Sequence, residues 1–185
     1  MNVILTSCGL DTKRIADVFT KMLPKPPSEV RAMFIPTAAI SPDAIDVLPK
    51  CLNDLRHCGI KDENIVVYDL HTELKQPVGD SFDVVYICGG DTKYLLKRIN
   101  EQGFDQRLLD FISSGGIVVG VSAGSVIFAN NLPDSLGLLK CPLGVHCKED
   151  SCTESGVYPS ERKEKINLSN RQALLFQGDS LFIIE

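Results

Sequence analysis

The segment GGIVVGVSAGSVIF, residues 115–128, places Ser122 between two glycines directly after an apolar run. Gly120, Ser122 and Gly124 form the G-x-S-x-G spacing, and here it joins a predicted strand to a predicted helix, the context that a nucleophile elbow requires. In such a turn the hydroxyl is exposed, and the amide of Ala123 points toward a developing oxyanion. The residues alone equally allow a junction of small residues that does no chemistry.

A second glycine turn lies in VVYICGGDTKYLL, where Gly89 and Gly90 follow another apolar run. Asp91 or Thr92 can cap the helix that comes next. The carboxyl ends of parallel strands meet at one edge of a sheet, where ligands bind. We therefore expect an amide of the Gly90 turn to join the Ala123 amide in an oxyanion hole, although a plain helix-start glycine pair is the alternative.

A serine hydroxyl needs a base, and the chain has three histidines. His57 ends a predicted helix, where a histidine is favourable for the helix dipole alone. His71 follows a predicted strand at the same edge and stays a reserve candidate. His146 lies in an irregular segment after the serine, and we favour it because loops carry function more often than helix ends do.

Short β-rich runs alternate with helical patterns along the first two thirds of the chain. The predicted strands are 3–6, 30–35, 64–70, 83–88 and 116–121, and predicted helices cover 12–23, 92–101 and 104–113. Another helix opens at Ser41, a capping residue, and ends at Gly59. Its apolar stripe consists of Ile45, Leu48, Leu52 and Leu55.

This order predicts an α/β fold in which a doubly wound, mostly parallel sheet has helices on both faces. After residue 131 the pattern becomes loop-rich as far as 158, with a short polar helix expected near 160–166. Two strands, ALLFQ and LFIIE, joined at Gly178 and Asp179, predict a hairpin at the sheet edge. We expect the whole chain, 1–185, to form one such domain.

Composition excludes several classes of protein. The 185 residues are 44% hydrophobic, enough for a core without metal or disulfide support. A net charge of −5 with scattered basic residues argues against a nucleic-acid partner. The start of the chain lacks a signal-peptide pattern, and no run is long and apolar enough for a membrane, so we expect a cytoplasmic protein. Its seven cysteines include no C-x-x-C pair and are expected to be free thiols.

Four motifs in order, FIPTAA, GGDTKYLL, VGVSAGS and LGLLKCPLGVH, resemble those of the peptidase E family of serine peptidases, which includes aspartyl dipeptidases and cyanophycinases. The resemblance implies a flavodoxin-like fold akin to class I glutamine amidotransferases, with Ser122 as nucleophile and His146 as base. It also implies an oxyanion hole from Gly90 and Ala123. The implied reaction is acyl transfer on small peptides, plausibly dipeptides with N-terminal Asp, and it requires no metal or organic cofactor.

The third member of the triad is left open by the sequence. Asp134 is the available carboxylate in ANNLPDSLG, while an alignment on NNLP puts Asn131 at that position. Glu149 and Asp150 are substitutes. An acid stabilises the histidine cation, so an asparagine would weaken catalysis.

Two further positions bear on activity and specificity. Asp91 stands where family members usually have asparagine, and its charge would oppose catalysis unless the side chain turns away as a helix cap. Arg162, in YPSERKEKI, lies where the family has the arginine that pairs with a substrate carboxylate, although an exposed helix arginine is the simpler interpretation.

Three rival interpretations remain. A zinc site could use Cys141, His146, Cys147 and Cys152, although their spacing is atypical. The chain could be a non-catalytic, regulatory or ligand-binding member of the same fold. An α/β-hydrolase esterase also has the elbow, but this chain is short for that fold.

Overall fold

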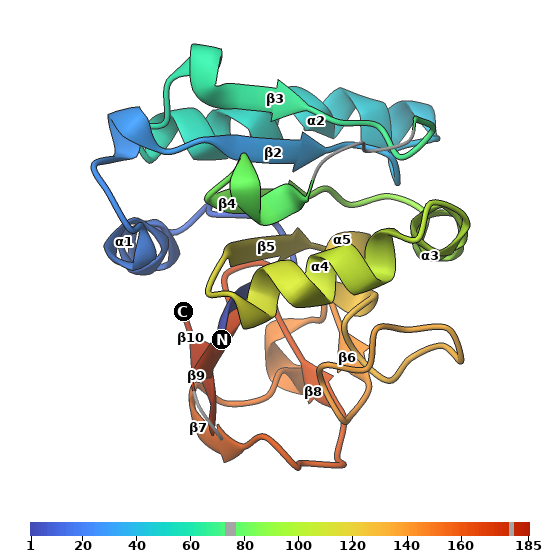
Figure 1. The fold of residues 1–185 in the computed structure, drawn as a ribbon. Helices are drawn as coiled ribbons and strands as arrows, with labels where there is room; N and C mark the ends of the chain where they lie inside the picture. Colours follow the sequence, from blue (N-terminus) through green and yellow to red (C-terminus); the bar gives the residue numbers. More distant parts are fainter. Residues whose placement is uncertain (73–76, 178–179) are drawn as a thin grey trace.

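The computed structural model describes residues 1–72, 77–177 and 180–185 (Figure 1). Within them, eight strands form one sheet, five of them parallel and three antiparallel. In sheet order the strands are β3 (Ile65–Val67), β2 (Ala32–Ile35), β4 (Val84–Ile87), β5 (Ile117–Val121), β1 (Asn2–Thr6), β9 (Ala173–Gln177), β10 (Ser180–Ile184) and β7 (Gly156–Pro159). The predicted α/β class with a mostly parallel sheet is confirmed.

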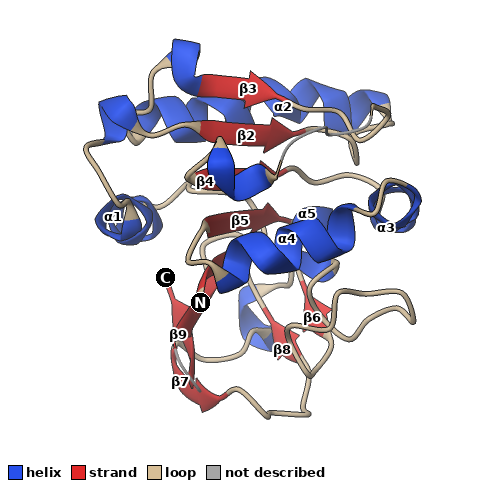
Figure 2. Ribbon diagram, in the orientation of Figure 1, coloured by secondary structure: helices blue, strands red, loops and turns tan. Residues whose placement is uncertain are grey.

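Helices cover both faces of this sheet, as Figure 2 shows. The α-helices are α1 (Lys13–Met22), α2 (Pro42–His57), α3 (Thr92–Glu101), α4 (Phe104–Ser113) and the single turn α5 (Ala123–Val126). Four short 3-10 helices are η1 (Pro27–Glu29), η2 (Asp62–Asn64), η3 (Val78–Asp80) and η4 (Glu149–Ser151). The helices predicted over 92–101 and 104–113 match α3 and α4, so local periodicity was sufficient to place them.

The alternation of side chains along the strands divides the core into two layers. On one face, α1 and α2 pack against Ile4, Phe34 and Tyr86. On the opposite face, α3, α4 and α5 pack against neighbouring strand residues such as Leu5 and Val85. Both faces of β2, β4 and β5 are therefore covered, and these three strands consist of buried residues throughout, as such sheets require.

The C-terminal third differs in part from the expectation. The two strands of the predicted hairpin are β9 and β10, whereas its turn, Gly178 and Asp179, lies outside the described residues. The hairpin does not form the edge, because β7 pairs with the outer side of β10. The short helix predicted near 160–166 is wrong: these residues form turns and lead into β8 (Ile166–Asn167), which pairs with β6 (Leu143–Gly144) in a separate two-stranded sheet.

Helix α2 begins and ends as predicted, and three of the four residues of the predicted stripe face the core: Leu55 is buried, and Leu48 and Leu52 pack against it. The Ser41 hydroxyl accepts a hydrogen bond from the Ala44 amide, and the residues buried on α2 are Cys51, Asp54 and Leu55. Ile45, which we placed on the buried stripe, is 49% exposed. Figure 1 shows that the first turns of α2, which begins at Pro42, continue past the ends of β2 and β3.

A buried carboxylate ties α2 to the sheet. Asp54 Oδ2 accepts hydrogen bonds from the Leu10 amide at 2.8 Å and from the Tyr86 hydroxyl at 2.6 Å. Tyr86 is fully buried on β4, so neither donor has water as a substitute partner. Asp54 thus fixes α2, the loop after β1 and the central strand relative to one another.

Replacing this carboxylate should therefore be costly. We expect Asp54→Ala to lower the free energy of unfolding by about 2–4 kcal/mol, because it leaves two buried donors without an acceptor. Asp17→Ala, which removes an exposed aspartate of α1, is the matched control and should change stability by less than about 0.5 kcal/mol. Urea denaturation measures both, and equal effects would contradict this role for Asp54.

The same residue makes stability depend on pH. Burial raises the pKa of the Asp54 carboxyl above its ordinary value of 3.8, although the bond from Tyr86 and the one from Leu10 lower it in part. The folded protein therefore holds this proton at pH values where the unfolded chain has released it. Relative to Asp54→Asn, the wild type should gain stability as the pH falls from about 7 to about 4. A difference that stays constant over this range would exclude the effect.

Candidate active site

Ser122 occupies a strained turn between β5 and α5. Its φ of 50° and ψ of −112° lie in a region that residues with a side chain rarely adopt. The turn is tight, because a Cβ built on Gly120 would lie 2.4 Å from the carbonyl oxygen of Gly124. The glycines of the G-x-S-x-G motif are thus required by close backbone approach, which is the physical reason for the spacing.

The end of β1 holds this turn in place. The Ser122 amide donates to the carbonyl of Thr6 at 2.9 Å. The buried Ser125 hydroxyl accepts from the Thr6 amide at 2.9 Å and lies 2.7 Å from the carbonyl oxygens of both Thr6 and Gly120. The strained backbone is therefore fixed by a closed set of hydrogen bonds.

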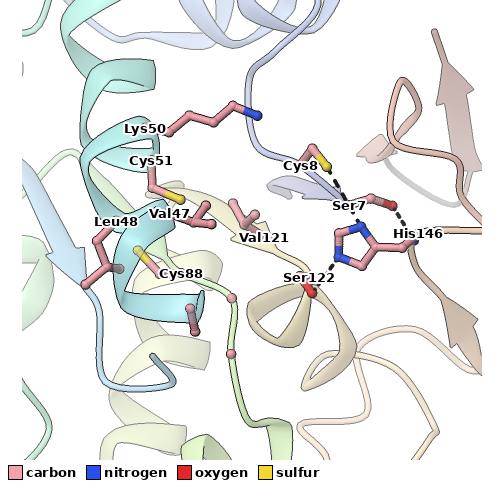
Figure 3. A pocket seen from close by; sticks show the side chains of 13 residues that line it. Ser7, Cys8, Val47, Leu48, Lys50, Cys51, Cys88, Val121, Ser122 and His146 are labelled. Carbon is pink, nitrogen blue, oxygen red and sulfur yellow. Dashed lines mark hydrogen bonds between the residues drawn. The ribbon is translucent and has the colours of Figure 1, made fainter. Parts of the chain in front are cut away.

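His146 lies beside the serine, as Figure 3 shows. Its Nε2 is 2.9 Å from Ser122 Oγ, within hydrogen-bond distance. The backbone of His146 has a φ of 55°, and its amide donates to the Ser7 hydroxyl at 3.1 Å. Ser7 also donates to the Leu168 carbonyl at 3.2 Å, so one serine links the loop of His146 to the end of β1 and the segment after β8.

The other ring nitrogen of His146 faces Asn170. Nδ1 lies 2.8 Å from the side-chain oxygen of Asn170 and 3.8 Å from the Cys8 sulfur. An acceptor at this position favours the tautomer with the proton on Nδ1, which leaves Nε2 free to accept the serine proton. The three side chains Ser122, His146 and Asn170 form a continuous hydrogen-bonded chain.

Asp134 does not take the place that we expected for it. It lies in a separate hollow beside α3, with Lys93 and Lys97, while His146 Nδ1 contacts Asn170. The alternative Asn131 is engaged elsewhere, since its side chain bonds both the amide and the carbonyl of Leu143. The other two candidates, Glu149 and Asp150, lie in η4 and are exposed.

Sequence reasoning missed Asn170. It lies in NLSNRQ, a polar stretch between two short strands, and asparagine there is typical of a turn. Its approach to His146 follows from the pairing of β9 with β1, which carries the residue just before β9 to the catalytic edge. No local pattern in the sequence encodes that pairing.

The second glycine turn lies against the serine. A Cβ built on Gly89 would be 3.0 Å from Ser122 Cβ, and Gly90 has a φ of 138° with its backbone against the carbonyl of Ala38. Within the described part of the chain, the amides of Gly90 and Ala123 donate to no protein acceptor. Two free amides beside a serine hydroxyl are the donors that an oxyanion hole needs.

The charge of Asp91 is turned away from these amides. Its carboxylate accepts a hydrogen bond from the Tyr94 amide at 2.8 Å and caps α3. The Asp91 side chain thus acts as a helix cap, the arrangement in which we expected its charge not to oppose catalysis. The negative charge stabilises the positive end of α3.

A cavity of about 300 Å³ opens beside Ser122 and His146 (Figure 3). Its walls come from the end of β1, the turns after β4 and β5, and the first half of α2. Burial raises the pKa of the Cys8 thiol that faces this cavity, so the thiol stays protonated near neutral pH. The lining residues are Ser7, Cys8, Ala44, Val47, Leu48, Lys50, Cys51, Cys88, Gly89, Gly90, Val121, Ser122 and His146.

Arg162 does not line this cavity. Its guanidinium lies over the ring of Tyr158, 4.9 Å from the centroid, and pairs with Glu164 at 2.9 Å.

The other two histidines are also engaged away from Ser122. His71 contacts Asp69 and the Tyr94 hydroxyl at 2.5 Å and 2.6 Å, and His57 ends α2.

The zinc alternative gains no support from the arrangement of side chains. Among the residues that the structure describes, no group of three His, Cys, Asp or Glu side chains could hold a metal ion. The Cys152 sulfur faces the Lys148 carbonyl at 3.1 Å, and Cys141 is buried in the core. All seven cysteines are free thiols, as expected.

The helices of the described ranges are all too short or too polar to span a membrane.

Curated relatives found by sequence are peptidases of uncharacterized function. The chain is 29% identical over 102 residues to "Uncharacterized peptidase Lin0382" of Listeria innocua. The aligned segment covers 54% of this chain and 47% of the relative. It is 40% identical over 58 residues to "Uncharacterized peptidase YgaJ" of Bacillus subtilis, 31% of this chain and 25% of the relative. The matched segment thus spans about half the length of the Listeria relative.

Solved structures share the fold. A crystal structure from Listeria monocytogenes EGD-e, described as a "Putative Peptidase E Protein", superimposes with a TM-score of 0.77 at 22% identity, covering 100% of this chain and 98% of the other. A peptidase from an acI-B1 Actinobacterium gives 0.66 at 16% identity, covering 98% and 86%. The sequence profile of Peptidase family S51 matches residues 3–138. The resemblance to the peptidase E family is therefore confirmed, and the chain belongs to peptidase family S51.

Proposed function

We propose that the protein is a serine peptidase that hydrolyses small peptides through an acyl-enzyme on Ser122. The observation that carries this proposal is the 2.9 Å contact between His146 Nε2 and a serine held in a strained turn. A hydroxyl next to a base, with two free amides alongside, is the arrangement that acyl transfer requires. Membership of a peptidase family supports a peptide as the acyl donor.

In the first half of the reaction, His146 Nε2 takes the proton of Ser122 as the oxygen attacks the peptide carbonyl carbon. The amides of Gly90 and Ala123 bind the oxyanion of the tetrahedral intermediate. The C–N bond then breaks, and the protonated His146 gives its proton to the leaving amine. The products of this half are the free amine and an ester of Ser122.

In the second half, water takes the place of the amine. His146 accepts a proton from the water as its oxygen attacks the ester carbonyl, and the same two amides bind the oxyanion again. Collapse of the intermediate releases the carboxylic acid, and His146 returns the proton to Ser122. Asn170 keeps the ring in the productive tautomer throughout, but its amide oxygen carries no full charge to stabilise the imidazolium.

A preference for N-terminal Asp was expected from the arginine of the family. In this chain Arg162 is engaged with Tyr158 and Glu164 and does not line the cavity, so it does not supply the cation that this preference needs. We therefore propose hydrolysis of small peptides without assigning the substrate carboxylate to Arg162. A cytoplasmic location is part of the proposal and is supported by the free thiols.

The proposal is tested by hydrolysis of Asp-Leu, Leu-Leu and an isoaspartyl dipeptide, with wild type and Ser122→Ala side by side. We expect cleavage by the wild type and none by the variant, with unchanged circular dichroism. A fluorophosphonate should modify Ser122 in the folded wild type, as mass spectrometry of the peptide would show. A folded protein with neither cleavage nor modification would instead be a non-catalytic member of the family.

The histidine assignment gives a separate prediction. His146→Ala should lower kcat/KM by roughly 1,000-fold or more, because the serine loses its base. His71→Ala should have little effect, since His71 bonds Asp69 and Tyr94 and does not contact the serine. Equal losses in the two variants would overturn the assignment.

The neutral third residue gives another prediction. Asn170→Asp should raise kcat/KM about tenfold, because a carboxylate stabilises the imidazolium that forms during attack. Asn170→Ala should lower kcat/KM by a similar factor, because the ring loses its orienting acceptor. Asn130→Asp, at an exposed position, is the matched control for the added charge. No change from either Asn170 variant would show that the residue does not position His146.

A further inference from the structure

The wall of the cavity opposite the catalytic pair is apolar. Figure 3 shows Val47 and Val121 between α2 and Ser122, and Leu48, Cys51 and Cys88 also line the cavity. Leu48 also packs against the core on its far side, so this part of the wall has a firm support. Such a surface gains most from burying an apolar side chain, and its thiols are only weak hydrogen-bond donors to a carboxylate.

The exposure of α2 at the cavity is not explained by the fold. Val47 lies in the first half of α2 and lines the cavity, yet it is 49% exposed. A β-branched apolar residue left half exposed at the mouth of a catalytic cavity is the usual arrangement of a substrate contact. Because folding leaves Val47 half exposed, its burial by a bound apolar side chain would contribute hydrophobic free energy to binding.

The one lysine at the cavity is already neutralised. Lys50 Nζ lies 2.6 Å from Asp11 Oδ2, and this bond raises the pKa of Lys50. Lys50 is the only lysine or arginine among the described residues that line the cavity. A substrate carboxylate would therefore have to compete with Asp11 for Lys50 and lose its hydration against an apolar wall.

We infer that this cavity selects peptides whose residue on the acyl side of the cleaved bond has an apolar side chain, such as Leu or Met. This inference rests on the proposed function, because the acyl side is defined by attack of Ser122. Val47 and Leu48 are the specificity residues, and Val47 contacts the outer part of the substrate side chain. The preference is for apolar residues over Asp.

Two sets of reagents measure this preference. Dipeptides X-Leu, in which X is Leu, Met, Ala or Asp, should give kcat/KM values for Leu and Met at least about tenfold above the value for Asp. Diphenyl aminoalkylphosphonates with the side chain of Leu or Asp test the cavity without a peptide leaving group. In these reagents Ser122 Oγ attacks phosphorus, the P–O bond to one phenoxide breaks, and the serine proton leaves with the phenol.

A substitution at the cavity mouth tests the assignment of residues. Val47→Arg should lower kcat/KM for Leu-Leu about tenfold and raise it for Asp-Leu, reversing the order of the two substrates. Ile45→Arg adds the same charge to the same helix at an exposed position that does not line the cavity, so the order should stay that of the wild type. Circular dichroism and urea denaturation check that both variants are folded.

The outcomes separate the inference from the function beneath it. Faster cleavage and faster phosphonylation with the Leu reagents, reversed in Val47→Arg alone, would support the inference. Equal or greater rates with the Asp reagents, with Ser122 modified, would overturn the apolar preference and leave the serine peptidase standing. If neither phosphonate and no fluorophosphonate modified Ser122, both the apolar preference and the serine peptidase proposal would be overturned. An equal shift in Ile45→Arg would show that charge near the site, and not contact with Val47, sets the preference.

Discussion

The active-site geometry depends on the end of strand β1. The Thr6 carbonyl accepts hydrogen bonds from the Ser122 amide and from the buried Ser125 hydroxyl. The hydroxyl of Ser7, the next residue, accepts a hydrogen bond from the His146 amide. Nucleophile and base both have positive φ values, so neither conformation is favourable by itself. The pairing of β1 with β5 and β9 supplies the stability that holds the two strained residues 2.9 Å apart.

Charge is arranged sparingly around this geometry. Asn170 orients the ring of His146 without adding a negative charge, Asp91 caps α3, and Lys50 is paired with Asp11. The free amides of Gly90 and Ala123 are thus the groups left to stabilise a developing oxyanion. A site of this kind depends on oriented dipoles more than on ionised side chains, and the dipoles need little reorganisation during the reaction.

Much of the fold could be predicted because parallel strands and crossover helices have strong local patterns. The elbow at Ser122, the glycine turn at Gly90 and the helices α3 and α4 all follow from short stretches of sequence. The neighbour of His146 does not, because Asn170 reaches it only through the pairing of β9 with β1. The apolar residue Ile45 misled the interpretation of α2, since periodicity cannot tell a core from a helix end that extends past the sheet.

The residues that hold Ser122 and His146 in place come from distant parts of the chain. Ser122 lies in the parallel part of the sheet, whereas the Leu168 carbonyl and Asn170, which hold the loop and ring of His146, come just before β9. During synthesis the serine therefore emerges from the ribosome well before the residues that orient its base. A chain that has been synthesised only as far as β8 therefore contains Ser122 and His146 but lacks the Asn170 side chain that contacts His146 Nδ1.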